Sequence, residues 1–400
     1  MKNRLTQHLV LLFGLATITG SCIDEYTLPE AEAGKYEAEM VIEGRILSGE
    51  ESIFHLSYTT PLNSTEETPD ILNAQVHIIG QNGYRSEAAE FDIEDDCYVI
   101  DTRALENNTQ YAVEVTVDND TYQSKFQPLL TSPEIDEVTW RENESSVSIY
   151  VTTQAEQTDS RHFMWSFEED WEFHAEVDMR GNENIKPIYN HAHYPDLTET
   201  NNPYLFCWMH DVSRHILLHS SSNLSENLVK DIKLHEISIE DIRISYIYSI
   251  LVKQWSLSDE AYNYYATLKQ YTEEGDGLFS PILSELQGNI QCISNPEKRA
   301  HGYVLASNVT TKRTFIYEKD FKHIRSLYWD SYCTSKRTDQ EWGEEPSSPP
   351  EQWLSPWVIM AKDANRYDQD AVLYLWNCVD CRHTPGASKK RPDFWPNNHE

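Results

Sequence analysis

Positive charge is scarce in this chain of 400 residues. Its 32 lysines and arginines stand against 66 aspartates and glutamates, which gives a formal net charge of −34. Binding to nucleic acid requires clustered Lys and Arg that replace counterions on the phosphates, and docking on anionic lipid requires the same charge. The composition therefore argues against both kinds of partner. Strong negative charge of this kind keeps a protein soluble.

Motifs for catalysis and cofactor binding are missing as well. The chain contains no G-x-S-x-G elbow, no Walker loop, no dinucleotide glycine fingerprint and no H-E-x-x-H zinc motif. A glycosidase-type pair of carboxylates stays open as an alternative, because nothing distinguishes any pair among so many acidic residues. We therefore expect a protein that is not an enzyme and holds no cofactor or metal.

Candidate metal ligands lack the pattern of a metal site. His191 with His193, and His215 with His219, would chelate a transition metal only if the fold brought the pairs together. Residues 363–368 begin like an EF-hand loop, but tyrosine and aspartate stand where that loop needs a ligand and a glycine. Scattered surface histidines and an ordinary loop are the simpler interpretation.

Apolar runs long enough to cross a bilayer are lacking. The run Leu9–Ala16 is shorter than the ~20 residues of a spanning helix. Positive residues precede it, and the small residues Thr19-Gly20-Ser21 follow it, directly before Cys22. This order is typical of a secretory signal peptide, so we predict one over residues 1–21.

A cysteine directly after the small residues indicates a bacterial lipobox, in which Cys22 becomes the acylated N-terminus. Thr19 departs from the leucine that is commonest three residues before the cysteine, and an ordinary signal peptide that happens to contain a cysteine is the alternative. Asp24 and Glu25 resemble the surface-export signal of Bacteroidota lipoproteins. We predict lipidation at Cys22 and a polar tether over residues 22–36.

Six cysteines remain beyond the lipobox. They are Cys97, Cys207, Cys292, Cys333, Cys378 and Cys381. An even number in an exported chain predicts up to three disulfides, whose pairing the sequence does not resolve. Cys378 and Cys381 form a C-x-x-C pair that zinc or thioredoxin-like redox chemistry would also use. The absence of a second C-x-x-C and of a βαβ pattern favours a disulfide framework that pins the C-terminus.

Alternating apolar residues predict a mainly β fold with a minor helical part. The clearest case is the alternation from Tyr111 to Val117, followed by Asp118-Asn119-Asp120 and a second alternating run, which together predict a hairpin. Further strands are expected around residues 54–58 and 74–78. Strands and turns recurring over about a hundred residues predict an immunoglobulin-like β-sandwich over residues 37–130.

A larger β-rich domain is predicted over residues 134–400, after the proline-containing connector 128–133. The longest alternation, from Ile242 to Val252, predicts a central strand. Ser256–Asp259 then has the pattern of a capping box, and apolar residues at helical spacing predict the one clear helix near residues 257–272.

Several short segments occur together in a recognisable order. They are Cys22-Ile23-Asp24, the strand Glu39–Gly44, Gln254–Tyr262, Gly277–Pro281, Gly288–Ile290, Gly302–Ser307, Cys378–Arg382 and Pro392–Pro396. The set resembles the Bacteroidota lipoproteins catalogued as domain of unknown function 4249. The resemblance implies a surface-exposed outer-membrane lipoprotein, typically encoded beside a TonB-dependent transporter. No catalytic residues are known for that family, and the Lys389-Lys390-Arg391 run departs from the glycine-rich link expected there.

From these features we expect an accessory or ligand-capture subunit of a TonB-dependent nutrient uptake system, anchored by lipid in the outer membrane and facing the cell exterior. The expected partner is the transporter itself. Two alternatives stay open at this point: a surface hydrolase with dispersed acidic catalytic residues, and a purely structural surface protein.

Overall fold

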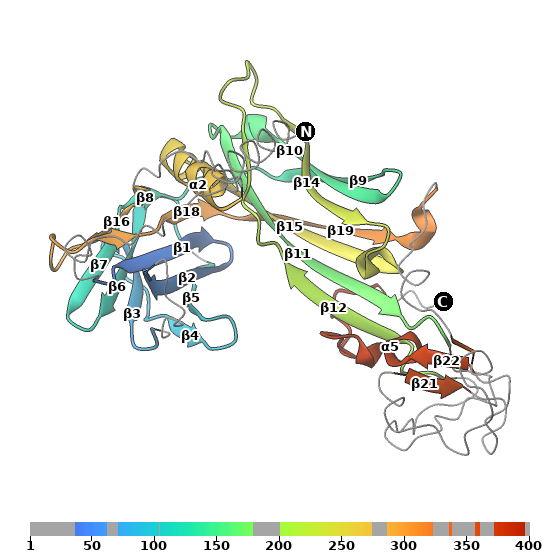
Figure 1. Cartoon of the computed structure of the whole chain (residues 1–400). Helices are drawn as coiled ribbons and strands as arrows, with labels where there is room; N and C mark the ends of the chain where they lie inside the picture. Colours follow the sequence, from blue (N-terminus) through green and yellow to red (C-terminus); the bar gives the residue numbers. More distant parts are fainter. Residues whose placement is uncertain are drawn as a thin grey trace, which may run out of the picture.

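The computed structural model describes residues 37–61, 71–103, 105–178, 201–273, 286–322, 336–337, 357–360 and 372–396. Most of its strands form two lobes, each built from two β-sheets, and a helix lies where the lobes meet (Figure 1). In these ranges no helix combines the length and the apolar character that a bilayer crossing needs. The predicted fold class, mainly β with a minor helical part, is confirmed.

The first lobe is a sandwich of two sheets. One sheet has the order β1, β2, β5, β4 and the other β7, β6, β3. Their bounds are β1 Met40–Ser48, β2 Glu51–Tyr58, β3 Gln75–Gly80, β4 Glu90–Asp92, β5 Cys97–Asp101, β6 Gln110–Val117 and β7 Asp120–Ser124. Labelled A to G in chain order, these strands give sheets A-B-E-D and G-F-C, the arrangement of a constant-type immunoglobulin domain. The predicted immunoglobulin-like sandwich and its β6–β7 hairpin are both present.

Side chains that alternate along these strands form the core of the first lobe. Ile42 and Phe54 of one sheet and Val76 and Val113 of the other belong to one buried apolar cluster. Successive side chains of a strand point to opposite faces of the sheet, so the sequence alternation places one apolar face of each sheet inward. Burial of this area is the main stabilising contribution to the lobe.

A segment from far along the chain completes both sheets of the first lobe. β16 Ile290–Cys292 pairs with β7, while β17 Ala300–His301 and β18 Val304–Asn308 pair with β1 in parallel. Figure 1 shows these strands in orange among the blue and cyan strands of the lobe. The prediction assigned residues 134–400 to a second domain and did not foresee that residues 290–308 pair with the first lobe. Local periodicity in the sequence does not show which distant strand a segment will pair with.

Gly302 permits the close approach of the returning segment. Its φ is +94°, and a Cβ atom there would lie 2.1 Å from the carbonyl oxygen of Ile42 in β1. Both conditions require glycine, since other residues rarely adopt this backbone conformation and would overlap the strand.

The second lobe also packs two sheets face to face. One has the order β14, β10, β9, and the larger has β12, β11, β15, β19 with β13 also paired to β11. Their bounds are β9 Ile135–Glu142, β10 Ser146–Thr153, β11 His162–His174, β12 Phe206–Val212, β13 Leu217–Ser220, β14 Val229–Ser238, β15 Ile247–Leu257 and β19 Thr310–Tyr317. One buried cluster joins the two sheets, with Val147 and Ile149 on one side and Trp165 and Tyr248 on the other.

The central strand β15 differs from its sequence prediction at the start. Ile242–Ile244 forms a 3-10 turn capped by Asp241, whose side chain accepts a hydrogen bond from the Arg243 amide. The strand then runs from Ile247 to Leu257 between β11 and β19. The prediction of a central strand is confirmed, but its beginning at residue 242 was wrong, because a local cap outcompeted the alternating pattern.

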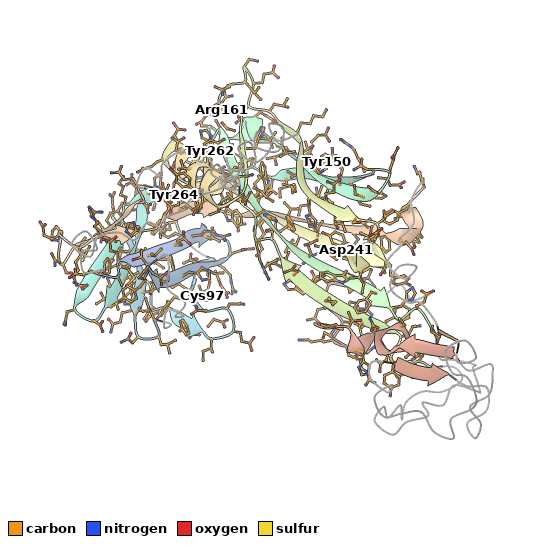
Figure 2. The ribbon with its side chains drawn as sticks, viewed as in Figure 1. Cys97, Tyr150, Arg161, Asp241, Tyr262 and Tyr264 are labelled. Carbon is orange, nitrogen blue, oxygen red and sulfur yellow. A yellow bond between two sulfur atoms is a disulfide. The ribbon has the colours of Figure 1, made fainter. Side chains whose placement is uncertain are left out.

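The predicted helix is α2, Asp259–Thr272, and Tyr262 and Tyr264 mark it at the junction of the lobes (Figure 2). Ser258 is the N-cap, and its hydroxyl accepts a hydrogen bond from the Ala261 amide. The prediction placed the capping serine at Ser256, which was wrong: Ser256 belongs to β15, and its backbone is committed to the sheet. Tyr264 of this helix is buried, and its ring lies 4.9 Å from that of Tyr303 between centroids.

An apolar cluster at the junction joins the lobes. Leu47 of β1 and Leu305 of β18 pack with Met164 of β11, Trp255 of β15 and Tyr264 of α2. The connector between the lobes is held in place too, because the amide of Asn308 donates to the carbonyl of Leu130 at 2.9 Å. The two lobes are therefore linked by a shared core as well as by chain connections.

The C-terminal segment is attached to the second lobe by a disulfide between Cys207 of β12 and Cys381. Cys378 is disulfide-bonded as well, and Cys333 lies outside the described residues. The predicted framework that pins the C-terminus is therefore confirmed for this link. The small elements of this segment are β20 Lys336–Arg337, β21 Trp357–Met360, β22 Val372–Leu375, α5 Trp376–Val379 and a 3-10 turn over Cys381–His383.

Two of the expected disulfide cysteines carry free thiols, which corrects the prediction for them. Cys97 begins β5 in one sheet of the first lobe, and Cys292 ends β16 in the other sheet. Both are buried, and Cys292 belongs to the apolar cluster of this lobe. A buried free cysteine packs as a small apolar residue. An even count of cysteines does not reveal such packing.

Candidate functional site

Two adjoining hollows of about 620 and 320 Å³ lie between the lobes, and we call them together the interlobe cleft. β1 and β2 of the first lobe form one side, and β11, β12 and β15 of the second lobe form the other. The residues that line both hollows are Arg45, Ile53, His55, Ser166, Ser213 and Trp255. A hollow of this size at a junction of two lobes is the usual setting of a ligand site.

The face of β11 toward the cleft follows from strand alternation. Phe163, Trp165 and Phe167 point into the core of the second lobe. Ser166 and Glu168, on the opposite face, line the cleft. One strand therefore supplies both an aromatic core and a polar wall, as period-two alternation allows.

Lys253 of β15 links the two sides of the cleft. Its ammonium group lies 2.8 Å from a carboxylate oxygen of Glu168 in β11 and 3.3 Å from one of Glu50, which follows β1 in the first lobe. Burial alone would lower the pKa of Lys253, but the hydrogen bonds and charges of the two glutamates outweigh it and raise the pKa. Lys253 therefore stays charged and its charge is matched within the protein.

The wall of the cleft mixes exposed apolar and polar side chains. Ile53 of β2 is 41% exposed and Val212 of β12 is 46% exposed, so both present apolar surface to the cleft. His55 hydrogen-bonds the Asp96 carbonyl at 3.2 Å, and His210 contacts Asp170 at 2.8 Å. The lining thus offers apolar contact together with hydrogen-bonding groups, the composition of a small-ligand site.

Buried carboxylates on β11 form a second feature, which the sequence interpretation did not single out. Glu169 accepts from the Tyr248 hydroxyl at 2.6 Å and the Arg243 guanidinium at 3.0 Å, and it lies 3.2 Å from His235. Burial would raise the pKa of Glu169, but His235, Tyr248 and Arg243 outweigh it and lower the pKa. The group is an ionised carboxylate whose partners already satisfy it.

Asp170 and Glu172 lie on the opposite face of the same strand. Arg313 of β19 contacts Asp170 at 2.9 Å. The indole of Trp395, from the C-terminal segment, donates to Glu172 at 2.5 Å. Burial raises the pKa of Glu172 to about 7, although Trp395 and Arg391 act against that rise. The signal that could have revealed these residues is the run Glu168-Glu169-Asp170 inside a strand otherwise rich in aromatic residues.

The predicted histidine pairs are placed differently by the structure. His219 lies in strand β13, so His215 and His219 do not share a helical face, and His215 is 3.7 Å from Glu273. His191, His193 and residues 363–368 lie outside the described residues. Within the described part of the chain no three His, Cys, Asp or Glu side chains are grouped as metal ligands.

The lipidation site Cys22 also lies outside the described residues, so it stays a prediction. No curated protein matches the chain. The family described as "Domain of unknown function (DUF4249)" matches residues 23–313, which is more than half of the chain and includes nearly all of both lobes. On this match, the chain belongs to the DUF4249 family.

Proposed function

We propose that this chain is a lipid-anchored outer-membrane protein of the bacterial surface that captures a ligand in the interlobe cleft for a TonB-dependent transporter. The observation that carries the proposal is the cleft itself, a hollow of about 620 Å³ with exposed aliphatic and hydrogen-bonding groups at the junction of the lobes. The N-terminal sequence before Cys22 supports the anchor. The resemblance to Bacteroidota lipoproteins supports the transporter as partner.

The proposal gives the protein a binding role and no catalytic one. The buried carboxylates of β11 would be the natural candidates for a surface hydrolase. Glu169 is committed to Tyr248 and Arg243, and Asp170 to Arg313. Partners of this kind hold a carboxylate in one charge state, whereas an acid–base catalyst exchanges a proton. For Glu169 and Asp170, these contacts favour a structural role over acid–base catalysis.

The anchor and the partner are tested together by purification from outer membranes extracted with mild detergent, followed by mass spectrometry. We expect a TonB-dependent transporter in stoichiometric amount and an acylated N-terminal cysteine. The matched control is Cys22→Ser, which should lose the acyl chains and the membrane association while keeping both lobes folded. Recovery of the wild-type protein alone, without transporter or acylation, would contradict the proposal.

A further inference from the structure

Three side chains that line the smaller hollow of the interlobe cleft carry hydrogen-bond donors without an acceptor in the described part of the chain. Arg45 of β1, Trp255 of β15 and Tyr265 of α2 line the smaller hollow. The Arg45 guanidinium lies over the Trp255 ring, 4.6 Å from its centroid. Among the residues that the structure describes, neither Arg45 nor the Tyr265 hydroxyl has a hydrogen-bond acceptor or an ion-pair partner, and the buried indole nitrogen of Trp255 has none either.

Lys253, which also lies between the lobes, provides a comparison, because its charge is paired with carboxylates. Lys253 has two glutamates within hydrogen-bonding or ion-pair distance, whereas Arg45 has none among the described residues. Burial lowers the pKa of Arg45, against the opposing effects of Tyr265 and Glu50. A recessed charge without a partner is unfavourable unless something else supplies one. In a chain with twice as many acidic as basic residues, an unmatched arginine at a hollow is a specific feature.

We propose that Arg45 and Tyr265 bind a carboxylate group of the ligand in the interlobe cleft. The inference rests on the proposed ligand-capture function and names the chemical class of the ligand. The planar guanidinium donates two parallel hydrogen bonds that match a carboxylate. The Tyr265 hydroxyl adds a third donor from the helix side, and the exposed side chain of Ile53 offers apolar contact to the rest of the ligand.

The charge balance favours a singly charged group. One guanidinium without a partner among the described residues compensates one negative charge. Lys253 and Arg214, which also line the cleft, already lie beside carboxylates, and Glu43 in the lining of the smaller hollow repels a second negative charge. A phosphate monoester carries about −1.5 to −2 at neutral pH and would leave charge uncompensated. Carboxylate ligands of two origins fit this chemistry: the C-terminus of a short peptide and the uronic acid of a glycan.

The test is calorimetric titration of the purified full-length protein with matched pairs of probes. Acetyl-trialanine is compared with its C-terminal amide, and methyl glucuronide with its methyl ester; inorganic phosphate is titrated separately. We expect at least tenfold weaker binding of the neutral member in one pair or in both. The pair that shows the difference identifies the origin of the carboxylate. Because this comparison uses the unaltered protein, it does not depend on whether a variant folds.

Variants then locate the site. Arg45→Gln should weaken the binding of the acid probe at least tenfold, Arg45→Lys should weaken it less, and Tyr265→Phe should weaken it a few-fold. Arg85→Gln is the matched control: it also removes one guanidinium from the first lobe, but Arg85 lines neither hollow and pairs with Glu114 at 2.9 Å. The control should bind as the wild type does.

Several outcomes would overturn the ligand class. They are equal binding of acid and neutral probes, binding of phosphate alone, no binding of any probe, or unchanged binding by a folded Arg45→Gln. Recovery of a transporter in the membrane purification together with any of these results would leave the proposed function standing and reject only the carboxylate site.

Discussion

The interiors of the two lobes are filled with different chemistry. In the first lobe the buried polar residues that the structure describes carry hydroxyls or an amide, as at Ser52, Thr102 and Asn289, beside an apolar cluster without buried carboxylates. The second lobe buries Glu169, Asp170 and Glu172 on one strand, among tryptophan and phenylalanine side chains. Apolar burial is the main stabilising contribution to the first interior, and hydrogen bonds between neutral groups satisfy its polar residues. The second depends on partners for its charges, since an unpaired buried carboxylate is strongly unfavourable.

This contrast shows how each lobe depends on distant segments. The first lobe receives β16–β18 as additional strands, held by backbone pairing and close approach. The second receives side-chain partners: Arg243 and Arg313 for its carboxylates, and Trp395 and Cys381 from the C-terminal segment. Variants that act on one kind of dependence should leave the other lobe largely unchanged, and hydrogen exchange resolved by peptide can measure each lobe separately.

The largest expected effect is that of Gly302→Ala on the first lobe. The added Cβ would meet the Ile42 carbonyl oxygen at 2.1 Å, and the positive φ adds strain. We expect a loss of about 4 kcal/mol or more in the free energy of unfolding. Hydrogen exchange should speed up in β1 and β18, and less so in β10 and β14.

Gly83→Ala is the matched control for that variant. Gly83 also has a positive φ, +88°, but nothing lies within 4 Å of the position of its Cβ. Its cost should be the conformational strain alone, about 1–2 kcal/mol. Equal destabilisation by the two variants would show that the approach of the returning segment to β1 contributes nothing.

Removal of the Cys207–Cys381 disulfide should destabilise the second lobe only. The bond closes a loop with a sequence separation of 174 residues, and loss of a native disulfide costs about 2–4 kcal/mol. Double replacement by serine should speed up hydrogen exchange in β11 and β12 and leave β2 and β6 unchanged. If the first lobe lost protection to the same degree, the two interiors would unfold as one unit and the comparison would fail.

Thiol labelling tests the cysteine assignments directly. In the native protein we expect Cys97 and Cys292 to resist alkylation, since burial and the nearby aspartates raise the pKa of Cys97 to about 11. Unfolding without reductant should make both react, while Cys207, Cys378 and Cys381 should stay unlabelled until reduction. Labelling of Cys381 in unreduced protein would contradict the disulfide.

The stability of the second lobe should depend on pH through the ionisation of Glu172. Its folded pKa of about 7 lies above the usual value of 4.5, so the folded state binds more protons than the unfolded state between these two values. Stability contributed by the protonated group is fully present below pH 4.5 and decreases as the pH rises toward 7. The loss is about 2–3 kcal/mol, measured as the urea midpoint of the second lobe from pH 5 to pH 8.

Glu172→Gln should flatten that decrease, because the amide keeps a hydrogen-bond acceptor for Trp395 and cannot ionise. Glu169→Gln is the contrasting variant. The pKa of Glu169 is lowered, so its stabilising contribution is present above the unfolded pKa of about 4.5 and is lost as the pH falls through the folded pKa. The two variants should therefore change opposite ends of the pH profile, and identical profiles would reject the assignment.

The smallest expected effect is that of Lys253→Met on the coupling of the lobes. Lys253 is half-buried and contacts one glutamate from each lobe, but solvent screening keeps such pairs near about 1 kcal/mol. We expect slightly faster exchange at the β1–β15 junction. Lys298→Met is the control, because its ion pair with Asp120 lies within the first lobe. If both variants changed hydrogen exchange at the junction equally, Lys253 would not be a specific link between the lobes.

Local signals were sufficient for much of the fold. The β6–β7 hairpin followed from alternation and the Asp118–Asp120 turn, and α2 followed from apolar spacing. Errors arose where two local patterns competed. Ile242–Ile244 alternates like a strand but is held by the Asp241 side chain in a 3-10 turn, and Ser256 has the chemistry of a cap but belongs to β15.

The candidate site could not be predicted from local sequence patterns. Arg45 has no motif around it, and its significance depends on Trp255, Tyr265 and the lack of a carboxylate partner among the described residues. The cysteine count likewise predicted disulfides in general, yet Cys97 and Cys292 are buried as free thiols. Pairing of side chains depends on distances between strands that lie far apart in the chain.

The sequence by itself determined the β-rich class, the immunoglobulin-like alternation of the first lobe and the helix at the junction, because these depend on periods of two and 3.6 residues within short windows. Only the tertiary structure decided the return of β16–β18 to the first lobe, the partners of the carboxylates of β11, the Cys207–Cys381 link and the cleft around Arg45. All of these contacts join residues that are at least 40 positions apart in the chain, and several span more than a hundred positions or join the two lobes. Local propensity carries no information about such contacts, since they depend on packing and charge matching in the complete fold.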